Sequence, residues 1–122
     1  ATKPQIEFST GSGALFRDGD YIPLFKVQPI YPRRAKERNT EGYVVVAFTI
    51  TESGTIENAY VMEGKCRSAS NRDGQYRDCT MFNSATLRAA TKLKYKPTIR
   101  DGRAVAVEDI PHKFTFELEQ DV

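Results

Sequence analysis

The fold of this 122-residue chain depends above all on residues 42–62, Gly42-Tyr-Val-Val-Val-Ala-Phe-Thr-Ile-Thr-Glu-Ser-Gly-Thr-Ile-Glu-Asn-Ala-Tyr-Val-Met62. The first half of this stretch alternates: one face of an extended strand would carry Val44, Val46, Phe48 and Ile50. Residues 51–54 supply turn chemistry, because Gly54 can adopt a positive φ. A second apolar run follows at once, so the stretch predicts a β-hairpin.

In the second strand, the apolar residues change phase between Ile56 and the pair Ala59 and Val61. A phase change inside an apolar run predicts a bulge. Residues 64–78 are polar and are expected to form a solvated loop.

Two helices are predicted around the hairpin. Pro32 suits the first turn of a short helix over residues 33–38. Thr80 is a candidate N-cap for a second helix over residues 82–93, whose apolar side chains recur every three or four positions. Pro97 follows the end of this helix.

Residues 103–119 are expected to form the third strand, with Val105 and Val107 in one phase and Phe114 and Phe116 in the other. Pro111 lies at the break and lacks a backbone N–H, so the strand is predicted to lie at an edge of the sheet. An edge strand presents a row of unpaired backbone groups.

These elements predict an α+β fold of two layers, with a three-stranded antiparallel sheet and both helices on one face. The face of the sheet opposite the helices would be partly exposed to solvent or covered by the N-terminal arm. Residues 1–20 lack periodicity and are interpreted as that arm or as the end of a linker, and residues 21–122 as one domain.

Composition narrows the class of protein. The net charge is +2, from 18 basic and 16 acidic residues, which does not favour nucleic-acid binding, although a local basic patch is compatible with it. No apolar run approaches the roughly 20 residues that a membrane helix needs. The chain starts at Ala1, so we expect it to be a fragment of a longer protein.

The two cysteines, Cys66 and Cys79, lack the spacing of a redox or zinc motif. They are either free thiols or a disulfide that closes the polar loop. The second alternative is favoured, and it implies an oxidising compartment.

The sequence gives little reason to expect catalysis, so we predict that the chain is not an enzyme. His112 is the only histidine, and no nucleophile elbow or phosphate loop occurs. Neither metal-ligand spacing nor a cofactor motif is present, so no metal and no cofactor are expected. The lack of catalytic motifs favours a binding or mechanical module over an enzyme.

The ordered combination of Q-P-x-Y-P at residues 28–32, G-x-V-x-V-x-F-x-I at 42–50, the Gly54 turn, the F-x-x-A-x-x-x-A helix and Y-x-P at 95–97 resembles the C-terminal domain of TonB energy transducers. The resemblance covers about residues 21–118. It implies a periplasmic domain of a Gram-negative protein that is anchored in the inner membrane by an N-terminal helix not contained in this chain.

The resemblance also implies partners. The domain would bind the TonB box of outer-membrane receptors as an added strand, and ExbB and ExbD would supply energy for uptake of iron-siderophores, haem or cobalamin. The candidate partner-binding residues are Gln28, Pro29, Ile30, Tyr31, Ile110, His112, Lys113, Phe114, Thr115, Phe116, Glu117 and Leu118. For Tyr31, packing against the first helix is favoured over partner contact.

Other readings stay open. A homodimer paired edge to edge is compatible with such a sheet, and the N-terminal arm could cover the same edge. The loop closed by the cysteines is longer than is usual in the family. A TolA-like tethering module or a periplasmic sensor domain of the same fold is the alternative function, and an enzyme ranks last.

Overall fold

The computed structural model describes residues 21–119. Along the chain its elements are α2 (Arg33–Glu37), β1 (Thr40–Ile50), β2 (Ile56–Ser68), β3 (Arg77–Asp78), α3 (Asn83–Ala90), β4 (Thr98–Arg100), β5 (Arg103–Val105) and β6 (Val107–Phe116). The arm predicted over residues 1–20, and the prediction that it covers the sheet edge, lie outside these residues. No helix among residues 21–119 is long and apolar enough to span a membrane.

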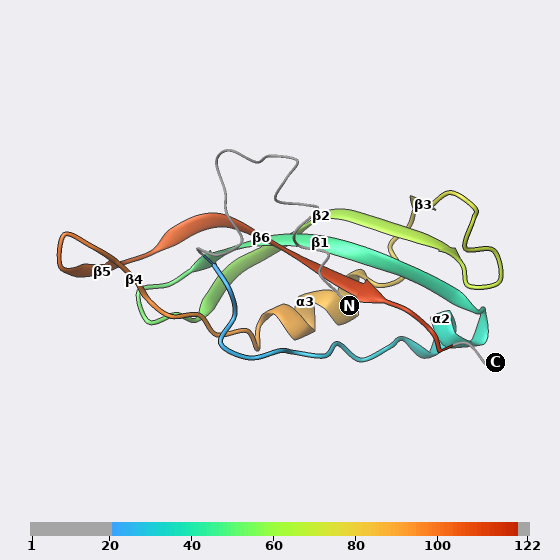
Figure 1. Ribbon diagram of the computed structural model, residues 1–122, viewed down its shortest axis with the longest axis horizontal. Coiled ribbons are helices and arrows are strands. Elements are labelled where there is room, and N and C mark those ends of the chain that lie inside the picture. Colours follow the sequence, from blue (N-terminus) through green and yellow to red (C-terminus); the bar gives the residue numbers. More distant parts are fainter. Residues whose placement is uncertain (1–20, 120–122) are drawn as a thin grey trace.

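The strands β1, β2 and β6 form the antiparallel sheet that the sequence predicts, in the order β3-β2-β1-β6. Helices α2 and α3 lie on the same side of this sheet (Figure 1). The α+β, two-layer prediction is therefore confirmed. The structure adds the two-residue strand β3 at one end of the sheet and a separate hairpin of β4 and β5.

The turn between β1 and β2 forms where the sequence places it. The Gly54 N–H donates to the Thr51 carbonyl at 2.9 Å, and Gly54 has a φ of +88°. A Cβ at this position would come within 2.0 Å of the Tyr95 carbonyl oxygen. Both the backbone conformation and the close approach of the chain after α3 therefore require glycine here.

The predicted bulge in β2 is confirmed, and a second one accompanies it. The register against β1 shifts between Val45 and Val46 and again between Ala47 and Thr49, with the extra residue on β2 each time. Asn58, at the second shift, has a φ of +56°. Each bulge resets which side chains face the helices, and this explains the change of phase in the sequence.

The core lies between the sheet and α3. Val44, Val46, Phe48 and Ile50 are at most 1% exposed, and they face a helix side rich in small residues. Ala85 and Ala89 on α3 allow a close approach to the strands. On the second face, Val45 and Ala47 are also buried, at 2% each.

Three predictions about boundaries are wrong. Helix α3 begins at Asn83, after Phe82, and the Thr80 side chain does not cap it. The loop expected from residue 64 is partly strand, since β2 continues to Ser68 and β3 pairs with it. The third strand is divided, because residues 103–105 turn back on β4 through Asp101 and Gly102, which both have positive φ, and only β6 joins the main sheet.

Candidate partner-binding edge

Strand β6 forms one end of the four-stranded sheet, which confirms the predicted edge. From Ile110 to Phe116 it pairs with β1 in an unbroken register, in which Pro111 lies opposite Ala47. A proline in an edge strand points its missing N–H away from the ladder. By alternation, Lys113 and Thr115 also direct their backbone N–H and C=O groups away from β1.

The opposite end of the sheet is less suited to adding a strand. Strand β3 covers β2 only at Lys65 and Cys66, and the rest of β2 contains both bulges. Bulges twist an edge and interrupt its pattern of hydrogen-bonding groups. The longest regular edge in the described sheet therefore runs along β6.

The candidate residues of β6 fall on two faces. Ile110, Phe114 and Phe116 are buried in the core, so only their backbone lies near the edge. Thr115 and Glu117 are exposed and present their side chains to solvent. The Lys113 ammonium lies 4.3 Å from the centroid of the Tyr43 ring, a cation–π contact. This contact lies on the sheet face opposite the core.

His112 is half-buried, and its ring lies edge-on to Phe114 with 4.8 Å between the centroids. Burial lowers the pKa of His112 from 6.5 to about 4, so the imidazole is neutral near pH 7. Its side chain therefore contributes to packing beneath the edge rather than a charge on it.

The segment 28–31 meets the C-terminal end of β6 through Tyr31. The Tyr31 ring lies 5.7 Å from Phe116 and 5.6 Å from Phe82, both edge-on, and its hydroxyl donates to the Thr40 carbonyl at 2.5 Å. Burial, followed by the nearby Glu41 carboxylate, raises the pKa of Tyr31 to about 12. Tyr31 therefore packs, but on Phe82 and Phe116 and not on the short helix that the sequence suggested.

The other residues of this segment differ in exposure. Gln28 and Ile30 are exposed, with 73% of Ile30 accessible, and Pro29 is half-buried. Because Tyr31 fixes the segment against Phe116, Gln28 and Ile30 are free to contact a molecule bound near the end of β6. The structure thus joins two groups of candidate residues that are about 80 positions apart in the sequence.

A buried ion pair that the sequence did not indicate lies where β6 ends. The Glu41 side chain is 1% exposed, and its carboxylate accepts hydrogen bonds from Arg72 and from the backbone N–H of Leu118. Arg72 also donates to the Leu118 carbonyl at 2.8 Å. Both backbone groups of Leu118 are therefore already bonded, so they are not available to pair with an added strand.

The environment of Glu41 favours its charged form. Burial alone would raise the pKa of the carboxyl group, but the hydrogen bonds from Arg72 and Leu118 and the charges of Arg72 and Arg67 hold it below its ordinary value. No pattern in the sequence could have paired Glu41 with Arg72, because 31 residues separate them and each is unremarkable alone.

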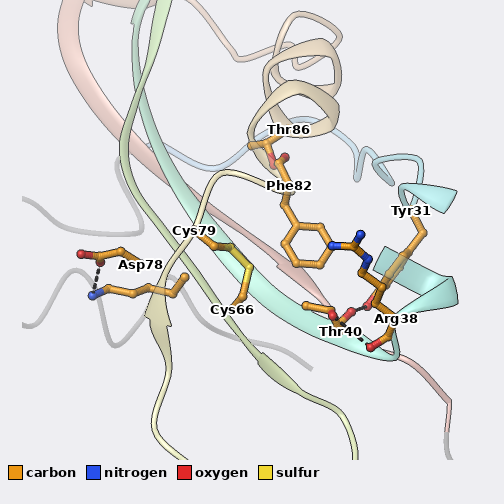
Figure 2. The surroundings of a disulfide bond; sticks show 9 residues. Tyr31, Arg38, Thr40, Cys66, Asp78, Cys79, Phe82 and Thr86 are labelled. Carbon is orange, nitrogen blue, oxygen red and sulfur yellow. Dashed lines mark hydrogen bonds and ion pairs between the residues drawn. A yellow bond between two sulfur atoms is a disulfide. The ribbon is translucent and has the colours of Figure 1, made fainter. Parts of the chain in front are cut away.

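The favoured pairing of Cys66 and Cys79 is confirmed as a disulfide. It joins β2 to the segment that leads into α3, with the Phe82 ring between the disulfide and Tyr31 (Figure 2). The loop that the disulfide closes contains Arg72. The disulfide therefore restrains the loop that contributes the arginine of the buried ion pair.

The residues at this edge provide backbone hydrogen bonds and apolar contacts rather than a set of catalytic groups. Among residues 21–119 no group of three or more potential metal-ligating side chains occurs. What the arrangement can do chemically is to accept an extended peptide along β6 and contact it with neighbouring side chains.

The sequence of this chain is similar to those of known proteins. The model of the Gram-negative bacterial TonB protein C-terminal family matches residues 27–69. Protein TonB of Pseudomonas aeruginosa is 35% identical over 109 residues, which cover 89% of this chain and 28% of that protein. Protein TonB of Salmonella typhimurium is 32% identical over 72 residues, or 59% of this chain and 26% of that protein.

Solved structures give a similar result. The solution NMR structure of the Pseudomonas aeruginosa TonB CTD is 30% identical and has a TM-score of 0.60, with 88% of this chain and 95% of that one covered. A structure of the TonB2 protein from Vibrio anguillarum is 29% identical with a TM-score of 0.52, and the match covers 81% and 82% of the two chains. The chain spans less than a third of the length of the curated relatives.

Proposed function

Because this chain belongs to the family of Gram-negative TonB C-terminal domains, we propose that its β6 edge binds the TonB box of outer-membrane receptors as an added strand. The domain would then pass energy from the inner-membrane proton motive force to the receptor. The transported ligands would be iron-siderophores, haem or cobalamin.

The observation that supports this proposal is the regular register of β6 from Ile110 to Phe116 at an end of the sheet. Strand addition obtains affinity from main-chain hydrogen bonds and specificity from alternate side chains. The outward-facing backbone groups of Pro111, Lys113 and Thr115 would provide the hydrogen bonds. At a net ~0.5–1.5 kcal/mol each, these bonds are compatible with reversible binding once ordering costs are included.

The side chains around the edge would supply the specificity. Thr115 and Glu117 would contact one side of the bound segment, and Lys113 would lie on the same face of the sheet. Gln28 and Ile30, held near the end of β6 by the contact between Tyr31 and Phe116, would contact the receptor beside the box. Gln28 offers both a donor and an acceptor for that purpose.

The cellular setting is part of the proposal. We expect the domain to act in the periplasm, where the Cys66–Cys79 disulfide is stable. ExbB and ExbD would act through parts of the full-length protein outside these 122 residues, including an inner-membrane anchor. The β6 edge of one chain could also pair with the β6 edge of a second copy. An experiment must therefore distinguish binding of the receptor segment from self-association.

An NMR titration of the 122-residue chain with a synthetic TonB-box peptide tests the proposal. We expect the largest shifts at the amides of Lys113 and Thr115, with a response at Gln28 and little change along β2. A scrambled peptide is the control. Shifts that centre on β2, or that are equal for both peptides, would contradict binding at β6, and shifts that appear on dilution alone would indicate self-pairing.

A further inference from the structure

The near-neutral net charge conceals a strong separation of charge. Residues 21–36 and residues 79–100 contain nine of the chain's 18 lysines and arginines and none of its 16 aspartates and glutamates. The rest of the chain therefore has a large acidic excess. A separation of this size creates a local positive potential that the net charge does not reveal.

The two segments lie together on the helix side of the sheet (Figure 1). The Leu24 N–H donates to the Lys94 carbonyl at 2.8 Å, and Tyr31 packs on Phe82. All nine cationic residues are exposed: Lys26, Arg33, Arg34, Lys36, Arg88, Lys92, Lys94, Lys96 and Arg100. We call the first eight the basic face, because β4, which ends at Arg100, extends beyond the helices (Figure 1).

The basic face also contains exposed apolar side chains. Ile22 and Leu24 are each 62% exposed and Phe25 is 51% exposed. The hydrogen bond from Leu24 to Lys94 places this apolar group beside Lys92, Lys94 and Lys96, and Lys26 follows it directly in the sequence. Burying these side chains in solvent-free surroundings would be favourable, but none of the described elements covers them.

We propose that the basic face binds the surface of an anionic lipid bilayer, with the side chains of Ile22, Leu24 and Phe25 entering the interface. Lysines attract phosphate headgroups, and aliphatic and aromatic side chains between them gain by entering the acyl boundary. The phosphates of a nucleic acid would also bind the lysines and arginines. Ile22 and Leu24 would gain nothing from it, because aliphatic side chains cannot stack on bases. This inference goes beyond receptor binding, because the lysines and the apolar side chains that it uses are not on β6, although the proposed receptor contacts Gln28 and Ile30 lie in the same segment as Lys26.

Vesicle co-sedimentation of the 122-residue chain tests the inference. We expect binding to vesicles of equal phosphatidylglycerol and phosphatidylcholine, weakening as salt is raised from 20 to 300 mM, and little binding to pure phosphatidylcholine. The triple variant Lys92→Gln, Lys94→Gln, Lys96→Gln should bind at least tenfold more weakly, since each interfacial lysine contributes about fivefold. The double variant Leu24→Gln, Phe25→Gln should lose at least fivefold.

Two matched controls lie away from the basic face. Met62→Gln removes a side chain that is 53% exposed on β2, and Arg77→Gln removes an exposed cation on β3. Both controls should bind vesicles within twofold of the unaltered chain. Far-UV circular dichroism of all variants, whose altered positions are exposed, checks that the fold is kept.

Three results would overturn the inference. The first is an absence of binding to anionic vesicles at low salt. The second is equal binding to both kinds of vesicle, because the lysines would then have no role. The third is loss of binding in the lysine variant but not in the Leu24 and Phe25 variant, because the apolar side chains would then not enter the interface.

Discussion

Arg72 donates hydrogen bonds to the carboxylate of the buried Glu41, across a separation of 31 residues, and the same guanidinium bonds the carbonyl of Leu118. This arrangement ties the disulfide-closed loop to the start of β1 and to the end of β6. It lies just beyond Phe116, where β6 ends.

The first prediction concerns this ion pair. Glu41→Gln keeps the shape of the side chain but leaves Arg72 without its charged partner, so the free energy of unfolding should fall by about 2–3 kcal/mol at pH 7. Urea unfolding measures the change. Because the pKa of Glu41 is lowered in the folded state, its contribution is present above pH ~4.5 and is lost as the pH falls. The difference between the two proteins should therefore shrink in acid.

The control is Asp78→Asn, which breaks the ion pair between Lys65 and Asp78 at 2.7 Å. Asp78 is 90% exposed, so solvent screens this pair, and its loss should change stability far less. Equal effects of the two variants would contradict the role assigned to Glu41.

The second prediction concerns His112. Its folded-state pKa of about 4 lies below the unfolded value near 6.5, so the unfolded chain takes up a proton first as the pH falls. Stability should decline between pH 6.5 and 4, by roughly 1–3 kcal/mol, and the decline should be reduced in His112→Leu. Urea unfolding across this range measures the slopes. Parallel slopes for the two proteins would show that His112 does not titrate in this way.

A third prediction follows from the disulfide, which closes a loop with a sequence separation of 13 residues. The double variant Cys66→Ala, Cys79→Ala should lose about 3 kcal/mol of stability, because its unfolded chain is less restrained. Thermal unfolding of the variant and of the unaltered protein, without and with a reductant, measures this. The reductant should lower the melting temperature of the unaltered protein only.

The fourth prediction compares two glycines with similar backbone conformations. Gly54 and Gly102 have φ of +88° and +80°, but a Cβ would meet the Tyr95 carbonyl at Gly54 and nothing within 4 Å at Gly102. Gly102→Ala should cost about 1 kcal/mol, from the backbone strain alone. Gly54→Ala should cost clearly more, because the chain at Tyr95 must also move. Similar costs in chemical unfolding would contradict the close approach.

The sequence was sufficient for features that local patterns encode. The alternation around Val46, the glycine at position 54 and the change of phase before Ala59 predicted the hairpin, its turn and a bulge, and Pro111 predicted the edge. Each of these depends on residues close together in the chain.

Features that depend on distant contacts could not be predicted. Phe82 begins the run of helical periodicity, yet α3 starts one residue later and Thr80 remains in the preceding turn. The pairing of Glu41 with Arg72 and the contact of Tyr31 with Phe116 join segments that no periodicity relates. The basic face was also missed, because the charges balance over the whole chain and separate only when residues 21–36 fold beside residues 79–100.

Strand addition at β6 is tested by intermolecular NOEs between an isotope-labelled chain and an unlabelled TonB-box peptide. We expect backbone contacts from the peptide to Lys113 and Thr115, spaced as in a β-ladder, with side-chain contacts to Gln28 or Ile30. Contacts to the bulged edge of β2, or to side chains only, would contradict strand addition at β6.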